Sequence, residues 1–325
     1  MDQLFTNLAL GFSTAATLSN LSYCFLGVLL GTLIGVLPGI GPLATIAMLL
    51  PVTYKMTDPV TALIMLAGIY YGAQYGGSTT AILVNLPGES SSVVTVLDGY
   101  QMARRGRAGP ALAIAAMGSF FAGTVATFLL AAFAPPLAEV AYKFGPAEYF
   151  SLMVLGLIAA VVLAHGSIWK ALGMVLLGLL LGMIGTDVNS GVARFSFDVP
   201  ELSDGIEFVA VAMGMFGFAE IILNLEQKEN REVFTNKVTN IFPRWADMKA
   251  AFPAMLRGTA LGSMLGILPG GGAVLSSFAS YAIEKKISKH PEEFGKGAIQ
   301  GVAAPESANN AGAQTSFIPM LTLGI

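Results

Sequence analysis

Residues 35–41 read GVLPGIG and residues 266–272 read GILPGGG, so one pattern occurs twice, 231 residues apart. Each copy closes a row of five glycines that keeps the same offset, and we call these rows the two glycine ladders. The first is Gly27, Gly31, Gly35, Gly39 and Gly41, and the second is Gly258, Gly262, Gly266, Gly270 and Gly272. Glycines four residues apart give a helix a flat face on which another backbone packs closely. The Leu-Pro-Gly near the end of each ladder predicts a helix break.

The composition around the ladders is that of a membrane protein. Of the 325 residues, 54% are hydrophobic and only 11% are charged, whereas a soluble domain carries about 25% charged residues. The net charge of −3 offers no basic surface to a nucleic acid. The single Cys24 excludes an internal disulfide, and no basic residue precedes Lys55, so the start of the chain does not resemble a cleaved signal peptide.

Apolar windows predict roughly eight to ten membrane segments, because a membrane helix needs about 20 mostly apolar residues. The clearest windows are 109–133, 147–164, 171–185 and 206–225, and further apolar stretches broken by Pro and Gly are 22–52, 59–97, 251–283 and 298–325. Lysine and arginine mark cytoplasmic loops, which places the loop after residue 97 and the loops 226–250 and 284–297 inside and the acidic loop 187–207 outside. Residues 251–283 then leave and return to the same side, as a hairpin or a pair of shorter helices.

Small polar residues follow each ladder. GGSTTAI at 76–82 matches GAQTSFI at 312–318, and NLPGESSS at 85–92 has a counterpart in APESANN at 304–310. We expect each of the latter two segments to form a second helix break. Such polar clusters are costly in hydrocarbon unless they face water, a ligand or one another. Duplicated halves with interrupted helices are typical of secondary transporters, and the interruptions mark the substrate site.

The predicted fold is an all-α polytopic membrane protein with two structural repeats that contain broken helices and membrane hairpins. We favour an inverted arrangement of the repeats. Residues 1–100 form the first repeat, with its helix break and hairpin, and residues 101–250 form scaffold helices and a cytoplasmic loop. Residues 251–325 form the second repeat.

The predicted site binds an anion with backbone dipoles and neutral side chains, because freed N–H groups at a helix start attract negative charge. The candidate substrate-binding residues are Pro38, Gly39, Gly41, Ser78, Thr79, Thr80, Asn85, Gly270, Gly271, Gly272, Asn309, Asn310, Thr315 and Ser316. Hydroxyl, amide and carbonyl oxygens also suit a sodium ion. The candidate ion-coupling residues are Glu89, Ser90, Ser91, Glu306, Ser307 and Gln314.

Some roles stay open from the sequence. For Glu89 and Glu306, coupling a proton or cation and a simple capping or loop role are equally supported. Asp98 adjoins a basic loop, so we expect it at the membrane interface. No cofactor beyond a coupling Na⁺ or H⁺ is expected, and no metal site.

Enzyme motifs do not account for the glycine-rich segments. Neither GVLPGIGP nor LPGGGA has the Lys-Ser/Thr of a phosphate-binding loop, and the chain has no HExxH or GxSxG pattern. We therefore expect a transporter and not an enzyme. A gated anion channel, or a carrier without a binding-protein partner, is the alternative, and an intramembrane hydrolase that uses Glu89 or Glu306 is a third hypothesis.

The motifs GVLPGIGP and GILPGGGA, with YGGSTTAILVNLPGESSS at 75–92 and APESANNAGAQTSFIPMLTLGI at 304–325, resemble the large membrane subunit of the tripartite tricarboxylate transporters, the TctA type. The resemblance implies a multi-pass permease of the bacterial inner membrane that works with a small membrane subunit and a periplasmic solute-binding protein. It further implies symport of citrate or other di- and tricarboxylates with sodium ions or protons, and an elevator-like movement of the repeats. Members of this family are longer, so we expect the second repeat to be truncated at Ile325.

Overall fold

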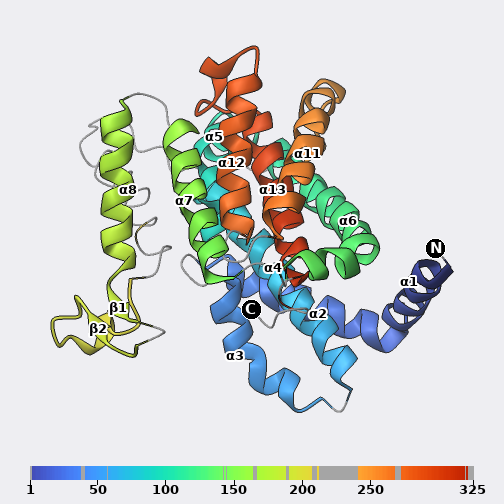
Figure 1. The fold of residues 1–325 in the computed structure, drawn as a ribbon. Helices are drawn as coiled ribbons and strands as arrows, with labels where there is room; N and C mark the ends of the chain where they lie inside the picture. The colour runs from blue at the N-terminus through green and yellow to red at the C-terminus, as the bar shows by residue number, and fades with distance from the viewer. Residues whose placement is uncertain are drawn as a thin grey trace.

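The computed structural model describes residues 2–37, 41–56, 58–141, 143, 145–163, 167–187, 190–206, 211, 241–267, 272–318 and 320. These residues are mostly helical (Figure 1). The α-helices are α1 (Asp2–Ala15), α2 (Leu18–Gly35), α3 (Pro42–Tyr54), α4 (Pro59–Val84), α5 (Val93–Arg104), α6 (Ala108–Ala141), α7 (Pro146–Leu163), α8 (Ile168–Gly182), α11 (Trp245–Leu265), α12 (Gly272–Ile287) and α13 (Gln300–Thr315). Short 3-10 helices are η1 (Ser90–Ser92), η2 (Pro200–Leu202) and η4 (Pro291–Glu293).

Each glycine ladder packs its helix against one partner helix. A Cβ atom on Gly31 of α2 would overlap the Ile69 carbonyl of α4, and one on Gly262 of α11 would overlap the Ala308 carbonyl of α13. Two more ladder glycines on each helix behave alike: Gly27 and Gly35 face Met65 and Ala73, and Gly258 and Gly266 face Ala304 and Gly312, whereas Gly41 and Gly272 meet only side chains. The predicted close approach of backbones along both ladders is therefore present.

The packing also sets how the two halves correspond. The ladder glycines are 231 residues apart, while their facing carbonyls, such as those of Ile69 and Ala308, are 239 residues apart. GGSTTAI and GAQTSFI match in sequence at an offset of 236 residues. The offset of the facing carbonyls is thus three residues larger than that of the sequence match. The backbone contacts and the similarity of the polar residues therefore follow two different offsets.

Both ladders end in the helix interruptions that their Leu-Pro-Gly motifs predict. Helix α2 ends at Gly35 and α3 begins at Pro42, while α11 ends at Leu265 and α12 begins at Gly272. Residues 251–283 accordingly lie on two helices, the first of which begins at Trp245. The tips themselves, which include Pro38, Gly39, Gly270 and Gly271, lie outside the described residues.

The second predicted break is present in one half and absent from the other. In the first half, α4 ends at Val84 and Asn85 caps it in a left-handed conformation with φ of 61°. The APESANN segment, by contrast, lies inside α13, which continues through Pro305. The prediction of a break there is wrong. Residues 301–313 are all buried against neighbouring helices, and this packing compensates for the one backbone hydrogen bond that the proline removes.

Two helices in the described part of the chain are long and apolar enough to cross a membrane, Leu18–Gly35 and Ala108–Phe133. Ile168–Gly182 is a shorter apolar helix. Fewer spans are thus evident than the eight to ten predicted. Of the helices next to the two interruptions, α3 and α12 are shorter than a full span, and most of the window 206–225 lies outside the described residues.

A short pair of strands departs from the all-α prediction. Strands β1 (Gly185–Thr186) and β2 (Ala193–Arg194) pair antiparallel in the acidic loop after α8. Arg194 forms an ion pair with Asp187 at 3.0 Å, and the left-handed Gly191 allows the turn between the strands. Helix α8 and this pair lie to one side of the main helical body (Figure 1).

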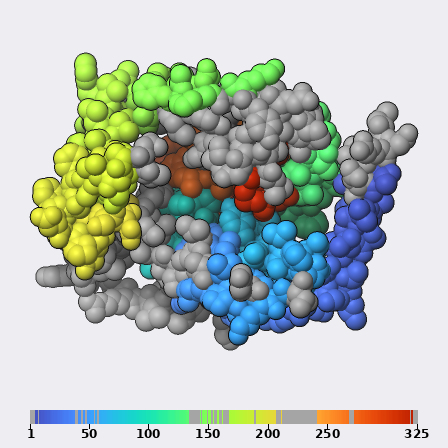
Figure 2. Space-filling model, turned by 60° about the horizontal axis from the view of Figure 1, so that its bottom comes forward, coloured from blue at the N-terminus to red at the C-terminus, as the bar shows by residue number. Residues whose placement is uncertain are grey.

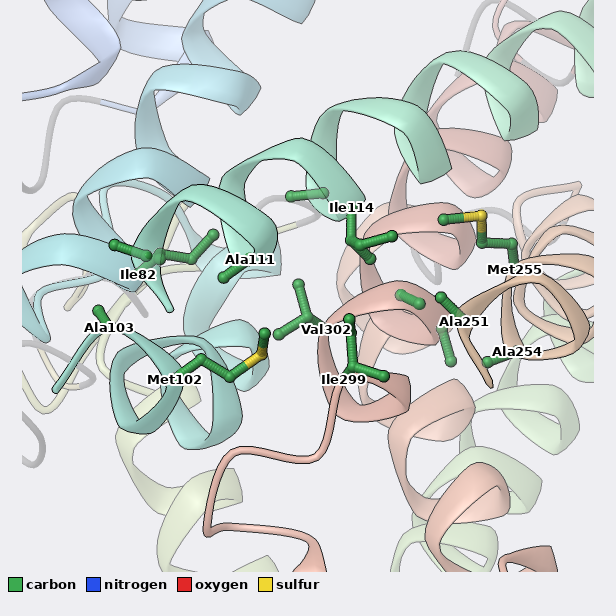
Figure 3. Packing of buried hydrophobic residues seen from close by; sticks show 14 residues of the cluster. Ile82, Met102, Ala103, Ala111, Ile114, Ala251, Ala254, Met255, Ile299 and Val302 are labelled. Atoms are coloured by element: carbon green, nitrogen blue, oxygen red, sulfur yellow. The ribbon is translucent and has the colours of Figure 1, made fainter. Parts of the chain in front are cut away.

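The apolar core lies where helices from both halves of the chain meet. Its residues come from the end of α4, from α5 and α6, and from α11 and α13, as Figure 3 shows. Ile82, Ile114 and Val302 are fully buried there. This core holds the first half of the chain against α13, and so it positions the polar residues that follow.

Candidate functional site

A buried carboxylate on α13 joins three elements that are far apart in the chain. Glu306 is only 1% exposed to solvent. Its Oε2 accepts a hydrogen bond of 2.9 Å from Ser78 Oγ on α4, and its Oε1 accepts one of 2.5 Å from Thr95 Oγ1 on α5. No lysine or arginine in the described part of the chain forms an ion pair with it. Neutral hydroxyl groups therefore hold this carboxylate.

A cavity of about 340 Å³ lies beside this carboxylate, between α4, α6 and α13. Figure 2 shows the same three segments meeting on one face, with the red end of α13 between light-blue and green atoms. The residues that line the cavity are Tyr71, Tyr75, Ser119, Phe120, Gly123, Thr124, Thr127, Glu306, Asn310 and Gln314. None of these residues is basic, and most carry a hydroxyl, amide or carboxylate group. The volume lies within the range of about 300–1,000 Å³ that is usual for small-molecule sites.

Two further hydrogen bonds connect the walls of the cavity. The Tyr71 hydroxyl on α4 donates to Oε1 of Gln314 on α13. Asn310 Nδ2 donates to Ser119 Oγ on α6 at 2.8 Å. The polar side chains of all three helices are thus oriented toward one another around the cavity.

Glu89 occupies a different setting from Glu306, although the sequence treats them alike. Its carboxylate accepts hydrogen bonds from the Ser91 hydroxyl and from Ser91 N, the latter at 3.2 Å. Ser92 Oγ accepts from Glu89 N at 3.4 Å, which completes a capping box at the start of η1. Of the two roles left open, the contacts of Glu89 are those of a cap, whereas Glu306 lies in mid-helix and caps nothing.

The cap at η1 also meets the second half of the chain. Ser277 Oγ on α12 donates to the Ser91 carbonyl at 2.7 Å. Gly77 of α4 has room only for a hydrogen atom, since a Cβ there would lie 2.8 Å from Cγ of Glu89. The interruption after α4 is therefore enclosed by α4 on one side and α12 on the other.

The sequence model of the tripartite tricarboxylate transporter TctA family matches residues 21–325 of this chain. The chain belongs to the TctA family. This is a family of membrane transporters and not of enzymes.

Relatives in Agrobacterium vitis extend the comparison. The chain is 66% identical over 325 residues to an "Uncharacterized 52.8 kDa protein in TAR-I ttuC' 3'region", covering all of this chain and 64% of that relative. It is 77% identical over 64 residues to an "Uncharacterized protein in TAR-II ttuC' 3'region", covering 20% of this chain and 26% of that protein. The chain thus spans slightly less than two thirds of the first relative. No solved structure matches it.

The cavity of this TctA-family chain gathers only some of the residues predicted from the sequence. Ser78, Glu306, Asn310 and Gln314 meet at or beside it. The hydroxyls of Thr79, Thr80 and Thr315 instead bond to carbonyls of their own helices, those of Tyr75, Gly77 and Ala311.

Other predicted residues lie near the helix interruptions. Gly41 is the N-cap of α3, and Ser316 Oγ donates to the Gly266 carbonyl at 3.0 Å, at the end of the second ladder. Gly272 begins α12 with φ of 34°. Ser90 and Ser91 belong to η1, and the Ser307 hydroxyl faces Gly118 of α6.

Sequence reasoning missed Tyr71, Thr95 and Ser119. The signal that could have found Tyr71 is its spacing, since residues three and four apart lie on one helix face and Tyr71 precedes Ser78 by seven. No comparable signal exists for Thr95 or Ser119, because their helices enter the site from other parts of the fold.

Asp98 has a structural role in this TctA-family chain, and its predicted place at the membrane interface stays a prediction. Its side chain is fully buried. Its Oδ1 accepts from the backbone N–H groups of Gly295, Gly297 and Ala298 at 2.9, 2.7 and 2.8 Å, and its Oδ2 accepts from the Tyr281 hydroxyl at 2.9 Å. Asp98 thus fixes the α12–α13 loop onto α5, a role that requires its full burial.

Proposed function

We propose that this chain is the permease subunit of a tripartite secondary transporter that takes up di- or tricarboxylates such as citrate. The observation that carries the proposal is the buried Glu306 carboxylate beside a cavity whose described lining offers hydroxyl and amide groups but no basic side chain. An anion held by neutral donors is bound without a fixed counter-charge that would retain it. Release on the inner side is then possible.

The helix starts after the ladders are proposed as the second source of anion binding. Helix α3 begins at Pro42 after Gly41, and α12 begins at Gly272. Free backbone N–H groups and the positive end of the helix dipole favour a carboxylate at such positions. Two starts of this kind suit a molecule with two or more carboxylates.

Glu306 is proposed as the residue that couples uptake to a cation gradient. Its carboxylate, together with the hydroxyl oxygens of Ser78 and Thr95, offers the hard oxygen ligands that a sodium ion prefers, and the same carboxylate can carry a proton. An ionisable residue buried in a membrane segment is a functional candidate by default. Glu89 is proposed to keep the η1 turn in shape instead.

The two halves are proposed to be structural repeats that move together in an elevator-like transport step. In support, α2 packs on α4 and α11 packs on α13 through equivalent ladders. An inverted relation of the repeats remains our preferred arrangement. Partners are proposed to be a small membrane subunit and a periplasmic solute-binding protein at the bacterial inner membrane, as the family's description as tripartite suggests.

A transport screen tests this proposal. The transporter is reconstituted with both partner subunits, and uptake of labelled citrate, a dicarboxylate and a monocarboxylate is measured under an inward sodium or proton gradient. We expect saturable uptake of the di- or tricarboxylate that needs the binding protein. Flux that neither saturates nor depends on any gradient would instead support the gated anion channel.

A further inference from the structure

Two buried amide groups, one on α4 and one on α13, lack hydrogen-bond partners in the described structure. Gln74 on α4 is 2% exposed, and neither its Oε1 nor its Nε2 has a partner. Asn309 on α13 is fully buried, and its Nδ2 has none. Buried polar groups are nearly always hydrogen-bonded, and each exception calls for an explanation such as an absent ligand. These two amides therefore point to a group that the protein itself does not supply.

Hydrogen bonds at two levels place Gln74 on the face of α4 that meets α13. Tyr71 bonds to Gln314, and Ser78 bonds to Glu306. Tyr71 precedes Ser78 on α4, whereas its partner Gln314 follows Glu306 on α13. The two helices therefore run antiparallel here. Gln74 lies three residues after Tyr71 and four before Ser78, hence on the same face and midway between the two bonds.

The facing level of α13 is that of Asn309 and Asn310. Glu306, Asn310 and Gln314 follow one another at intervals of four along α13, and all three line the cavity. Asn309 Oδ1 accepts from Asn310 Nδ2 at 2.7 Å, which leaves the Asn309 N–H groups as the free donors. Gln74 and Asn309 therefore lie at about the same level along α4 and α13, and neither is among the residues that line the cavity.

We infer that Gln74 and Asn309 together bind one carboxylate group of the transported substrate in a closed subsite next to Glu306. This inference rests on the proposed function and assigns the substrate contact within it. The unpartnered groups are mostly donors, two amide NH₂ groups, and a carboxylate is an acceptor only. In the described structure neither amide donates to Glu306, whose carboxylate accepts from Ser78 and Thr95.

The first test uses Gln74→Met, which keeps the length of the side chain and removes its polar atoms. Citrate binding to the purified transporter is measured by calorimetry at saturating sodium, together with the melting temperature without citrate. We expect citrate affinity to fall about tenfold or more, as for lost hydrogen bonds to a charged group. The melting temperature should stay the same or rise, because an unpartnered buried amide is removed. Asn309→Leu should lower citrate affinity in the same way, but because it also removes the acceptor of Asn310 Nδ2, its melting temperature should fall slightly.

Asn20 provides the matched control, because it is a buried amide with partners. Its Nδ2 donates to the Thr14 carbonyl at 2.8 Å, and its Oδ1 accepts from Thr61 Oγ1 at 2.6 Å. We expect Asn20→Leu to lower the melting temperature and leave citrate affinity unchanged, the opposite pattern. Citrate affinity of Gln74→Met within about twofold of wild type would overturn the inference.

Two other outcomes separate the inference from the function on which it rests. A tenfold loss of sodium affinity in Gln74→Met, with citrate affinity unchanged at saturating sodium, would show that the amides hold the cation and would overturn the carboxylate subsite alone. Absence of binding by the wild-type transporter to citrate, succinate and tricarballylate would overturn the proposed function and the inference together.

Discussion

Ser78 and Glu306 are 228 residues apart in the chain, yet the Ser78 hydroxyl donates to the Glu306 carboxylate at 2.9 Å in the interior of the helical body. This bond connects the helix that packs on the first glycine ladder with the helix that packs on the second. A buried carboxylate of the second half that is held by hydroxyls of the first half is sensitive to how the halves sit against each other. It is also the one described carboxylate that lines the cavity beside α13.

Glu306→Gln should separate coupling from folding. The substitution keeps the size of the side chain and the oxygen that Ser78 or Thr95 can reach, but removes the charge that a sodium ion or proton needs. We expect gradient-driven citrate uptake to fall about tenfold or more while the melting temperature changes by only a few degrees. The measurement is initial uptake rate against the size of the gradient.

Glu89→Gln is the control for that variant. Because Glu89 caps η1 through Ser91, its replacement should lower stability and leave the dependence on the gradient in place. Two results would contradict the roles assigned to these residues. One is that uptake by Glu306→Gln depends on the gradient as in wild type, and the other is that only Glu89→Gln loses this dependence.

The glycine ladders should not tolerate a methyl group. Gly31→Ala and Gly262→Ala each place a Cβ against a backbone carbonyl that cannot move without shifting its whole helix. We expect each to destabilise the protein by about 1–3 kcal/mol or more. Thermal unfolding in detergent measures this loss. Gly178→Ala on α8 is the matched control, since a Cβ there meets nothing within 4 Å, and an equal loss in this variant would contradict the packing account.

Asp98→Ala should release the loop between α12 and α13. The substitution leaves the N–H groups of Gly295, Gly297 and Ala298 without their acceptor, and each unsatisfied buried donor costs about 1–3 kcal/mol. We expect a clear drop in melting temperature and faster tryptic cleavage after Lys289. Asp98→Asn, which keeps one acceptor oxygen, should show a smaller effect. Cleavage at the wild-type rate in Asp98→Ala would contradict the anchoring role.

Asp58 at the start of α4 should show a pH-dependent effect. Hydrogen bonds from the Thr61 hydroxyl and from Val60 N hold the pKa of its carboxyl below the ordinary value of 3.8. The ionised cap is thus present at neutral pH, and its contribution is lost as the pH falls below 3.8 toward the lowered pKa. Asp58→Ala should melt lower than wild type at pH 7, with the two curves converging in acid. A difference independent of pH would argue against the cap.

The sequence predicted the features of the fold that depend on local pattern. The ladders, their helix ends and the two helices across 251–283 follow from glycine and proline spacing, and they are present in the described residues. Pro305 misled the prediction because tertiary burial maintains α13 through it. The structural role of Asp98 could not be predicted from the sequence, because its partners lie in a loop almost 200 residues further along the chain.

The candidate site was predictable only in part, for the same reason. Ser78, Glu306, Asn310 and Gln314 stand in the polar motifs, whereas Thr95 and Ser119 come from helices without such motifs. Gln74 was also missed, since a lone glutamine in an apolar helix has no sequence signal. Its significance lies in the absence of a partner among the described residues, and only packing reveals that.

Uptake of labelled citrate by the reconstituted transporter, with and without ionophores that collapse the sodium and proton gradients, tests the central claim most directly. If the chain is a cation-coupled carboxylate permease, citrate should accumulate above its external concentration with the binding protein present. This accumulation should stop when the coupling gradient is collapsed. Equal uptake with every gradient collapsed, or none for any di- or tricarboxylate under either gradient, would contradict the account.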